Sequence, residues 1–519
     1  MTALATRRRP IINQRLRIVL LLIVMTFLPL HAAAAPSGQL TWAVHVSVAP
    51  TFFDPAETPG VISPFMILYA LHDGLVKPMP GNATAPSLAE SWTASRDGLT
   101  YEFVLRKGVK FHNGDPLTAE DVKFSFERYK GGGAAIFKAR VAGVELVDPH
   151  RVRFRMKQPW PDFMAFYGTP ATGAAWIVPK KYVERVGDEG FKKAPVGAGP
   201  YRFVSYAPGV ELVLEANESY WRKTPNVKRL VLRMISDEAT RLAALKRGEV
   251  DIAYGFRGPL AEELRSSRGL TLKPTQPPFT EWLVFTDQFD PKSRWHDRRV
   301  RLAANLAIDR KAINEAENLG YARVSASIVP RDFQFAWPAP PYPYDPAQAK
   351  KLLAEAGHPR GFDAVEVSCD AVYVTTIEAV VNSLQAVGIR AKVRPVERAA
   401  FYKTDSEKGF KHLVRSSSSA AGNAATRMEA FVISGGIRAY GGYPDIDGLY
   451  REQASELDPK RRETILHKIQ QLMHERVMFA PILEAAFLNG VGPRAAEPGI
   501  GLITGFLYSA PFEDLKVKD

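Results

Sequence analysis

Apolar and polar residues alternate along much of the chain, and the period of the alternation changes from segment to segment. Residues 101–105, YEFVL, alternate with the period of two that is typical of a half-buried strand. Thr118 stands in front of a helical pattern, and Asp121 follows three residues later, as in a capping box. Strand and helix patterns succeed one another throughout the chain, which favours lobes of the α/β or α+β class.

The same patterns predict further elements along the chain. Asp345 and Pro346 form an N-cap followed by proline at the first helical position, and Gly357 ends that helix. Strands are expected over residues 40–48, 201–204, 250–254, 365–368 and 390–396. Helices are expected over residues 297–307, 375–386 and 458–477, and from a cap at Ser236 or Asp237 to about Arg247.

Two segments are candidates for crossings between lobes. With 519 residues the chain is too long for one ordinary core, so two or more lobes are expected. Residues 274–282 place three prolines between strand-like segments, and residues 480–489 form a strand-like run after the last long helix. Two crossings would build one lobe from both chain ends and the other from the middle. Ordinary loops within a single large domain remain the alternative.

The N-terminus has the pattern of a secretory signal peptide over residues 1–34. Five arginines without an acid precede the apolar run 18–30, which is shorter than the about 20 residues of a bilayer span, and alanines follow. An uncleaved anchor is the alternative. No cysteine stands directly after the apolar run, and the only cysteine is Cys369, far downstream. We therefore expect a cleaved periplasmic protein with neither a lipid anchor nor a disulfide.

The chain carries a formal net charge of +13, and its basic residues are mixed with acidic ones along the whole length. No basic arm interleaved with aromatic residues is present. Nucleic acid is therefore not expected as a partner.

One continuous stretch, residues 88–129, combines a strand, two turns and the capped helix. Its order of residues resembles the hallmark segment of the family 5 extracytoplasmic solute-binding proteins, the peptide-, opine- and nickel-binding receptors of ABC importers. Further segments resemble this family over nearly the whole chain: residues 196–203 (VGAGPYRF), 248–251 (GEVD), 299–310, 344–357, 384–389 and 445–447.

The resemblance implies an α/β fold of the two-lobed periplasmic-binding-protein type, a hinged clamshell with an extra subdomain in the first lobe. Lobe I would comprise residues 35–275 and 485–519, with the subdomain at about 59–174, and lobe II residues 276–484. The implied protein is a monomer without a cofactor. It captures a small molecule or short peptide and delivers it to a membrane permease driven by an ATPase. A periplasmic sensing or chaperone module of the same fold, without an importer, is the alternative.

The sequence departs from the peptide-binding branch between Leu413 and Arg427. Peptide binders of this family carry a Gly-Trp…Asp segment there, whose aspartate pairs with the α-amino group of the peptide. Here the segment has neither tryptophan nor acid. It instead offers guanidinium, hydroxyl and amide groups that suit an acidic, opine-like or polyhydroxylated solute. The candidate ligand-binding residues are Arg415, Ser416, Ser417, Asn423 and Arg427. A flexible surface loop is the alternative.

Three further residues are candidates for contact with the solute. Trp42 and His45 lie on the first predicted strand, and Trp282 lies just past the first predicted crossing. Aromatic side chains at such places often stack on ligands. Ordinary core packing of the two tryptophans is the alternative.

Neither a catalytic nor a metal site is expected. The sequence has no G-x-S-x-G elbow, no phosphate-binding P-loop and no H-E-x-x-H motif. His467 and His474 are seven residues apart on one predicted helix, which is too far for both to bind the same metal ion.

Overall fold

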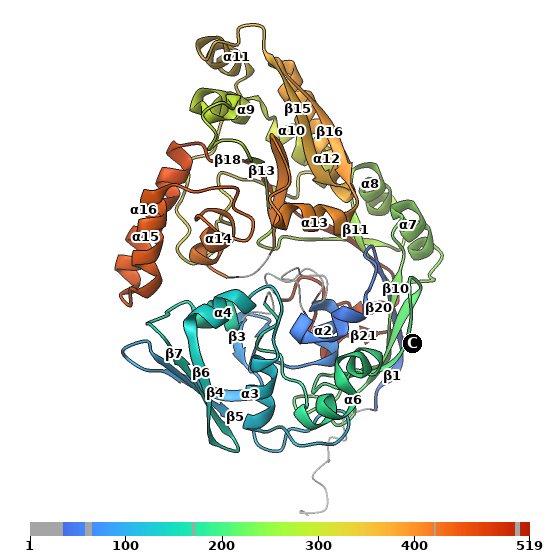
Figure 1. The fold of residues 1–519 in the computed structure, drawn as a ribbon. Coiled ribbons are helices and arrows are strands. Elements are labelled where there is room, and N and C mark those ends of the chain that lie inside the picture. The colour runs from blue at the N-terminus through green and yellow to red at the C-terminus, as the bar shows by residue number, and fades with distance from the viewer. Residues whose placement is uncertain (1–34, 58–64, 169–171, 420–421, 504–508, 519) are drawn as a thin grey trace, which may run out of the picture. The chain divides into compact units, whose positions relative to one another are not determined.

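The computed structural model describes residues 35–57, 65–168, 172–419, 422–503 and 509–518. The predicted signal peptide, residues 1–34, lies outside the described residues. Within these ranges the chain forms a seven-stranded sheet, a six-stranded sheet, a four-stranded sheet and two strand pairs (Figure 1).

The seven-stranded sheet has the first strand, β1, at its centre. β1 pairs in parallel with both β10 and β11, and the outer neighbours are antiparallel. Five consecutive residues of β1 are buried, which fits a central strand covered on both faces. In sheet order the strands are β12 (Thr271–Thr275), β19 (Phe487–Val491), β11 (Ile252–Phe256), β1 (Ser37–Val44), β10 (Val227–Met234), β9 (Glu211–Ala216) and β8 (Tyr201–Ala207).

The six-stranded sheet is built from the later part of the chain. Its central strand β13 is buried over its whole length and pairs antiparallel with β18 on one side and β17 on the other. In sheet order the strands are β14 (Arg323–Val324), β18 (Phe479–Glu484), β13 (Thr280–Phe285), β17 (Leu413–Ser418), β15 (Phe362–Asp370) and β16 (Ile389–Val396).

Two connections join these two sheets. The first leads from β12 of the seven-stranded sheet to β13 of the six-stranded sheet. The second leads from β18 back to β19. Each of the two segments predicted as a crossing therefore passes from one large sheet to the other.

The four-stranded antiparallel sheet lies within residues 89–156 and has its own apolar core. Its order is β4 (Ala89–Ala94), β5 (Thr100–Leu105), β7 (Arg151–Met156) and β6 (Val141–Asp148). The strand pairs are β2 (Val76–Met79) with β3 (Asn82–Pro86) and β20 (Ala495–Glu497) with β21 (Lys516–Val517).

Helices cover these sheets. The helices of the first half are α2 (Phe65–Leu71), α3 (Ala119–Glu127), α4 (Ala134–Arg140), α5 (Phe163–Tyr167), α6 (Lys180–Lys193), α7 (Glu238–Lys246) and α8 (Gly258–Ser266). The helices of the second half are α9 (Arg298–Ala307), α10 (Arg310–Asn318), α11 (Pro346–Glu355), α12 (Val374–Ala386), α13 (Arg398–Ser406), α14 (Ala424–Phe431), α15 (Pro444–Ser455) and α16 (Pro459–Glu475).

The predicted helix caps are confirmed where a side chain close in sequence caps the first turn. The capping box of α3 is present, with the Thr118 backbone N–H donating to Asp121 Oδ2 at 2.8 Å. Asp237 caps α7 and Asp345 caps α11, each by accepting a backbone N–H three residues later. The predicted strands and helices occur with small shifts of their ends.

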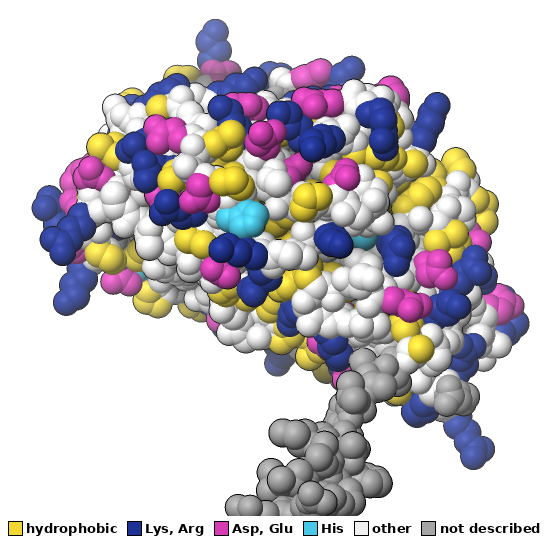
Figure 2. Space-filling model, turned by 90° about the horizontal axis from the view of Figure 1, so that it is seen from below, with side chains coloured by type: hydrophobic (Ala, Val, Ile, Leu, Met, Phe, Trp, Pro, Cys, Tyr) yellow, Lys and Arg dark blue, Asp and Glu magenta, His cyan; other side chains and the backbone are white. Residues whose placement is uncertain are grey.

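The charged surface has no single-sign patch on the face shown in Figure 2, where basic and acidic side chains are interspersed. In the described ranges, no helix has the length and apolar character needed to cross a bilayer.

The glycines of the VGAGPYRF segment are required by a close approach of two backbones. A Cβ atom on Gly199 would lie 2.5 Å from the carbonyl oxygen of Ala70, at the end of α2. The Gly199 N–H also donates to the Leu71 carbonyl at 3.0 Å, and this hydrogen bond holds the two backbones together.

We expect Gly199→Ala to lower the free energy of unfolding by about 1–3 kcal/mol, because the added methyl group meets backbone rather than a flexible side chain. Urea denaturation followed by circular dichroism measures this loss. Gly448→Ala is the matched control, since it lies on α15 with nothing within 4 Å of the new Cβ. The control should be neutral or stabilising by up to about 1 kcal/mol. Equal stability of the two variants would contradict the close-approach argument.

Candidate functional site

A cavity of about 520 Å³ lies where the two connections between the large sheets pass. We call it the sheet-junction cavity. The seven-stranded-sheet side contributes His45, just after β1, and the ends of α7 and α8. The other side contributes β13, α12 and the short helix η4 (Ala371–Tyr373). The second connection lines it as well, over residues 485–488. The lining side chains used below are His45, Glu238, Arg257, Phe279, Glu281, Glu317, Tyr373 and Thr376.

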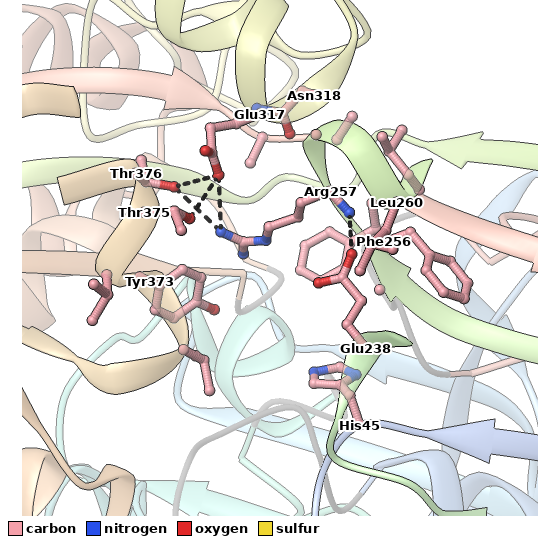
Figure 3. Close-up of a pocket in the computed structure, with 18 of the residues that line it drawn as sticks. His45, Glu238, Phe256, Arg257, Leu260, Glu317, Asn318, Tyr373, Thr375 and Thr376 are labelled. Atoms are coloured by element: carbon pink, nitrogen blue, oxygen red, sulfur yellow. Dashed lines mark hydrogen bonds and ion pairs between the residues drawn. The ribbon is translucent and has the colours of Figure 1, made fainter. Parts of the chain in front are cut away.

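Arg257 reaches across this cavity (Figure 3). Its backbone N–H donates to Glu238 Oε1 at 2.8 Å, and its Nη1 donates to Thr376 Oγ1 at 3.3 Å. The guanidinium carbon lies 4.9 Å from the Tyr373 ring centroid, and Nη1 lies 4.0 Å from Glu317. The cavity therefore offers carboxylates, a guanidinium group and an aromatic face within one space.

His45 adds an uncharged imidazole to the cavity wall. Burial, together with the charges of Arg241, Arg398 and Arg257, lowers the pKa of His45 to about 3. The ring is neutral at any pH near 7, because the depressed pKa lies far below it. His45 can thus exchange hydrogen bonds with a solute without adding a positive charge.

Arg415 lies behind this wall and is 1% exposed. Its Nη2 forms an ion pair with Glu281 Oε1 at 2.5 Å, and its guanidinium carbon stacks 3.3 Å from the Tyr373 ring centroid. Its Nη1 donates to Ser417 Oγ at 2.8 Å. Segment 413–427 contains no acid of its own, but the antiparallel register places Glu281 of β13 opposite Ser417. Arg415 therefore orders the cavity wall while Glu281 lines it.

The other predicted residues of this segment are divided between β17 and α14. Ser416 is buried within β17 and lies opposite Trp282 in the register. Asn423 is the N-cap of α14, and its Nδ2 donates to Asp162 Oδ1 at 2.7 Å. Asn423 therefore joins α14 to the segment that begins α5, rather than facing a described cavity.

Trp42 and Trp282 are core side chains, each with 0% exposure. Trp42 stacks on Tyr254 with 5.0 Å between ring centroids, and Trp282 meets Phe431 edge to face at 5.0 Å. Neither side chain lines the two cavities described here. Strand alternation marks such residues as buried, but it does not tell a core face from a cavity wall.

A second cavity, of about 470 Å³, lies between α4 and α5 on one side and α14 on the other. We call it the α14 cavity. Arg427 of α14 lines it and is 2% exposed. Ser418, at the end of β17, lines it too. Its partner in the register, Thr280, lies between Phe279 and Glu281, which line the sheet-junction cavity. The other polar side chains in its wall are Thr172, Thr426, Glu429, Ser434 and Arg438.

Sequence reasoning missed most of the sheet-junction cavity. Arg257 lies three residues after the predicted strand at 250–254 and precedes Gly258-Pro259, so a charged residue shortly after a buried strand was an available signal. Glu317 and Tyr373 gave no such signal, because their approach to the cavity depends on how α10 and η4 pack. No group of three or more potential metal ligands occurs among the described residues.

Comparison with known proteins gives a consistent result. Residues 83–438 match the profile of the bacterial extracellular solute-binding proteins, family 5. The glutathione-binding protein GsiB of Salmonella choleraesuis (strain SC-B67) is 31% identical over 60% of this chain and 60% of its own length. The matching region thus spans about three fifths of the length of this glutathione-binding relative. Di/tripeptide-binding protein 2 of Pseudomonas aeruginosa is 27% identical over 87% of this chain and 91% of its own.

Among solved structures, the binding protein MoaA of A. tumefaciens R10, in complex with mannopinic acid, superposes with a TM-score of 0.79. It is 25% identical and covers 93% of this chain and 100% of its own. These likenesses confirm the predicted α/β fold of the two-lobed binding-protein type.

Proposed function

Since the chain belongs to the bacterial extracellular solute-binding proteins of family 5, we propose that it captures a small solute and delivers it to an ABC importer. The permease of that importer would lie in the inner membrane, driven by an ATPase. The observation that carries this proposal is the sheet-junction cavity, whose wall comes from both large sheets and from their second connection.

The physical basis is closure around a hinge. A solute that contacts both sides of the cavity at once is bound only when the sides are together, so its binding shifts the population toward that state. A permease can then distinguish loaded from empty protein by shape. The proposed lobes are residues 35–275 with 485–519, including a subdomain at about 59–174, and residues 276–484.

We propose a peptide-like or opine-like solute. The cavity wall combines the carboxylates of Glu238, Glu281 and Glu317 with the guanidinium group of Arg257. Such mixed charge suits a solute that carries both ammonium and carboxylate groups. The similarity of this chain to glutathione-, di/tripeptide- and mannopinic-acid-binding proteins supports the same class of solute. The relatives are binding proteins, and we propose binding without catalysis for this chain.

We further propose that the protein works in the periplasm as a monomer, exported by a signal peptide over residues 1–34 and without a lipid anchor. A sensing or chaperone module of the same fold, without an importer, is the second candidate. Loss of solute uptake in a strain that lacks this protein separates the two, because only the importer component is needed for uptake.

Native mass spectrometry of protein released gently from the periplasm tests the proposal. We expect a retained peptide-like or opine-like solute that leaves on denaturation. Arg257→Gln should lose most of it, since the Arg257 side chain extends across the cavity to Thr376 and Glu317. Arg265→Gln is the matched control on the neighbouring α8, where Arg265 is half exposed and pairs with Glu262. Turnover of the solute by pure protein, or equal retention by both variants, would contradict the proposal.

A further inference from the structure

The α14 cavity contains a buried positive charge for which the described residues provide no acid. Arg427 is 2% exposed and forms no ion pair with a described residue. Its Nη2 donates to the carbonyl oxygens of Pro278 at 3.0 Å and Ser418 at 2.9 Å. Its Nε has no acceptor in the described part of the chain. An unpaired buried charge is costly, so this arrangement calls for an anion.

Other buried arginines show that burial without an acid is by itself no sign of a site. Arg301 donates from Nε and from both terminal nitrogens to four backbone carbonyls, and Arg310 is likewise bound through all three nitrogens. Both are fully satisfied within the fold, and neither lines the two cavities. Arg427 differs, because among the described residues only its Nη2 has hydrogen-bond acceptors, and its guanidinium carbon lies 5.3 Å from the Phe333 ring centroid. Its side chain also borders a cavity of about 470 Å³.

The remaining charges of the cavity wall are already compensated. Arg438 lies 3.7 Å from Asp405, and Glu429 lies 3.1 Å from Arg140 and accepts a hydrogen bond from Tyr450. Among the described charged side chains of this wall, the Arg427 guanidinium group therefore remains without an acid. Burial, and to a smaller extent Arg438, lowers the pKa of Arg427 to about 9, which leaves it charged at pH 7 and poorly stabilised.

We propose that the α14 cavity selects acidic solutes by binding one carboxylate group through the Arg427 guanidinium. A carboxylate carries a single negative charge that matches this cation. Nε and Nη1 remain as donors for its oxygens, because Nη2 already donates to the carbonyls of Pro278 and Ser418. The apolar part of the wall, with Ile136, Phe166 and Phe431, suits the carbon chain that bears the carboxylate. This inference rests on the proposed function, because it names the class of solute that the receptor takes.

Isothermal titration calorimetry with three acids and their neutral derivatives tests the inference. The probes are glutathione and its diethyl ester, dialanine and dialanine amide, and mannopinic acid and its methyl ester. We expect at least one acid to bind, and its neutral derivative to bind about ten- to hundredfold more weakly. Arg427→Gln should bind that acid as weakly as wild type binds the derivative, and the derivative itself with unchanged affinity.

Two further variants separate solute binding from folding. Arg427→Lys keeps the charge and should recover part of the affinity. Arg301→Gln removes a buried, carbonyl-bound arginine away from the cavity, so it should lower stability while leaving the affinity unchanged. Equal affinity for acid and derivative, or an Arg427→Gln variant that binds the acid as wild type does, would overturn the inference. Binding of none of the three acids would overturn it too, whereas a neutral solute retained in native mass spectrometry would leave the proposed function standing.

Discussion

Glu281→Gln is expected to lower the free energy of unfolding by about 3–5 kcal/mol, the cost of leaving a buried charge without its partner. The variant keeps the size of the side chain and removes only the charge that faces Arg415 at 2.5 Å. Arg415 is bound within β17 and stacked on Tyr373, so it cannot turn toward solvent to recover hydration. Urea denaturation followed by circular dichroism measures the loss.

A surface pair on the same sheet provides the matched control. Glu366 and Arg394 lie 3.2 Å apart with both side chains well exposed, and such pairs contribute about 0–1 kcal/mol. Glu366→Gln should therefore be nearly neutral. The double variant Glu281→Met with Arg415→Met should regain much of the stability, because removing both charges leaves none unpaired. A Glu281→Gln protein as stable as Glu366→Gln would show that Arg415 does not depend on its carboxylate.

Asp162→Ala is expected to weaken both stability and solute binding. Asp162 precedes α5 and is buried. Its Oδ2 lies 2.6 Å from Arg462 of α16, and its Oδ1 accepts a hydrogen bond from Asn423 at 2.7 Å. Loss of the carboxylate leaves Arg462 buried without an acid, at a cost of about 3–5 kcal/mol. Because the same contact holds α5 beside α14, this cost falls on the arrangement that forms the α14 cavity.

Calorimetric titration of the retained solute, with small-angle scattering of the loaded protein, measures this effect. We expect at least a hundredfold loss of affinity from a cost of this size. Asp188→Ala is the control. Asp188 lies on α6 and pairs with Arg128, and its side chain is more exposed than that of Asp162. If the Asp162→Ala variant bound the solute as tightly as the Asp188→Ala variant, the contact of Asp162 with Arg462 and Asn423 would not be needed for solute binding.

Several features of the fold follow from neighbouring residues alone. Thr118 and Asp121 are three residues apart, so their reciprocal hydrogen bonds require nothing beyond the first turn of α3. Asp345 and Pro346 begin α11 for the same local reason. The two connections between the large sheets were also predictable, because prolines and strand-like runs mark them in the sequence.

The candidate site was predictable only in part. His45 and Arg427 were named from the sequence, and both line cavities. Trp42 and Trp282 were named for the same kind of reason and lie in the core. A residue's pattern tells whether one face of its strand is buried, and this does not determine whether that face meets other side chains or an open space.

The order of strands and helices, their caps, the segments that join the sheets and, by resemblance, the family could all be predicted from the amino-acid sequence. These properties depend on residues near one another in the chain or on whole-chain similarity. Which buried charges have a partner depends instead on the folded arrangement of distant segments. Glu281 and Arg415 are 134 residues apart, and Asp162 and Arg462 are 300 apart. Strand register brings Glu281 to Arg415, and helix packing brings Asp162 to Arg462, but neither brings a described acid to Arg427. This difference distinguishes the arginines that stabilise the fold from the arginine proposed to bind a solute.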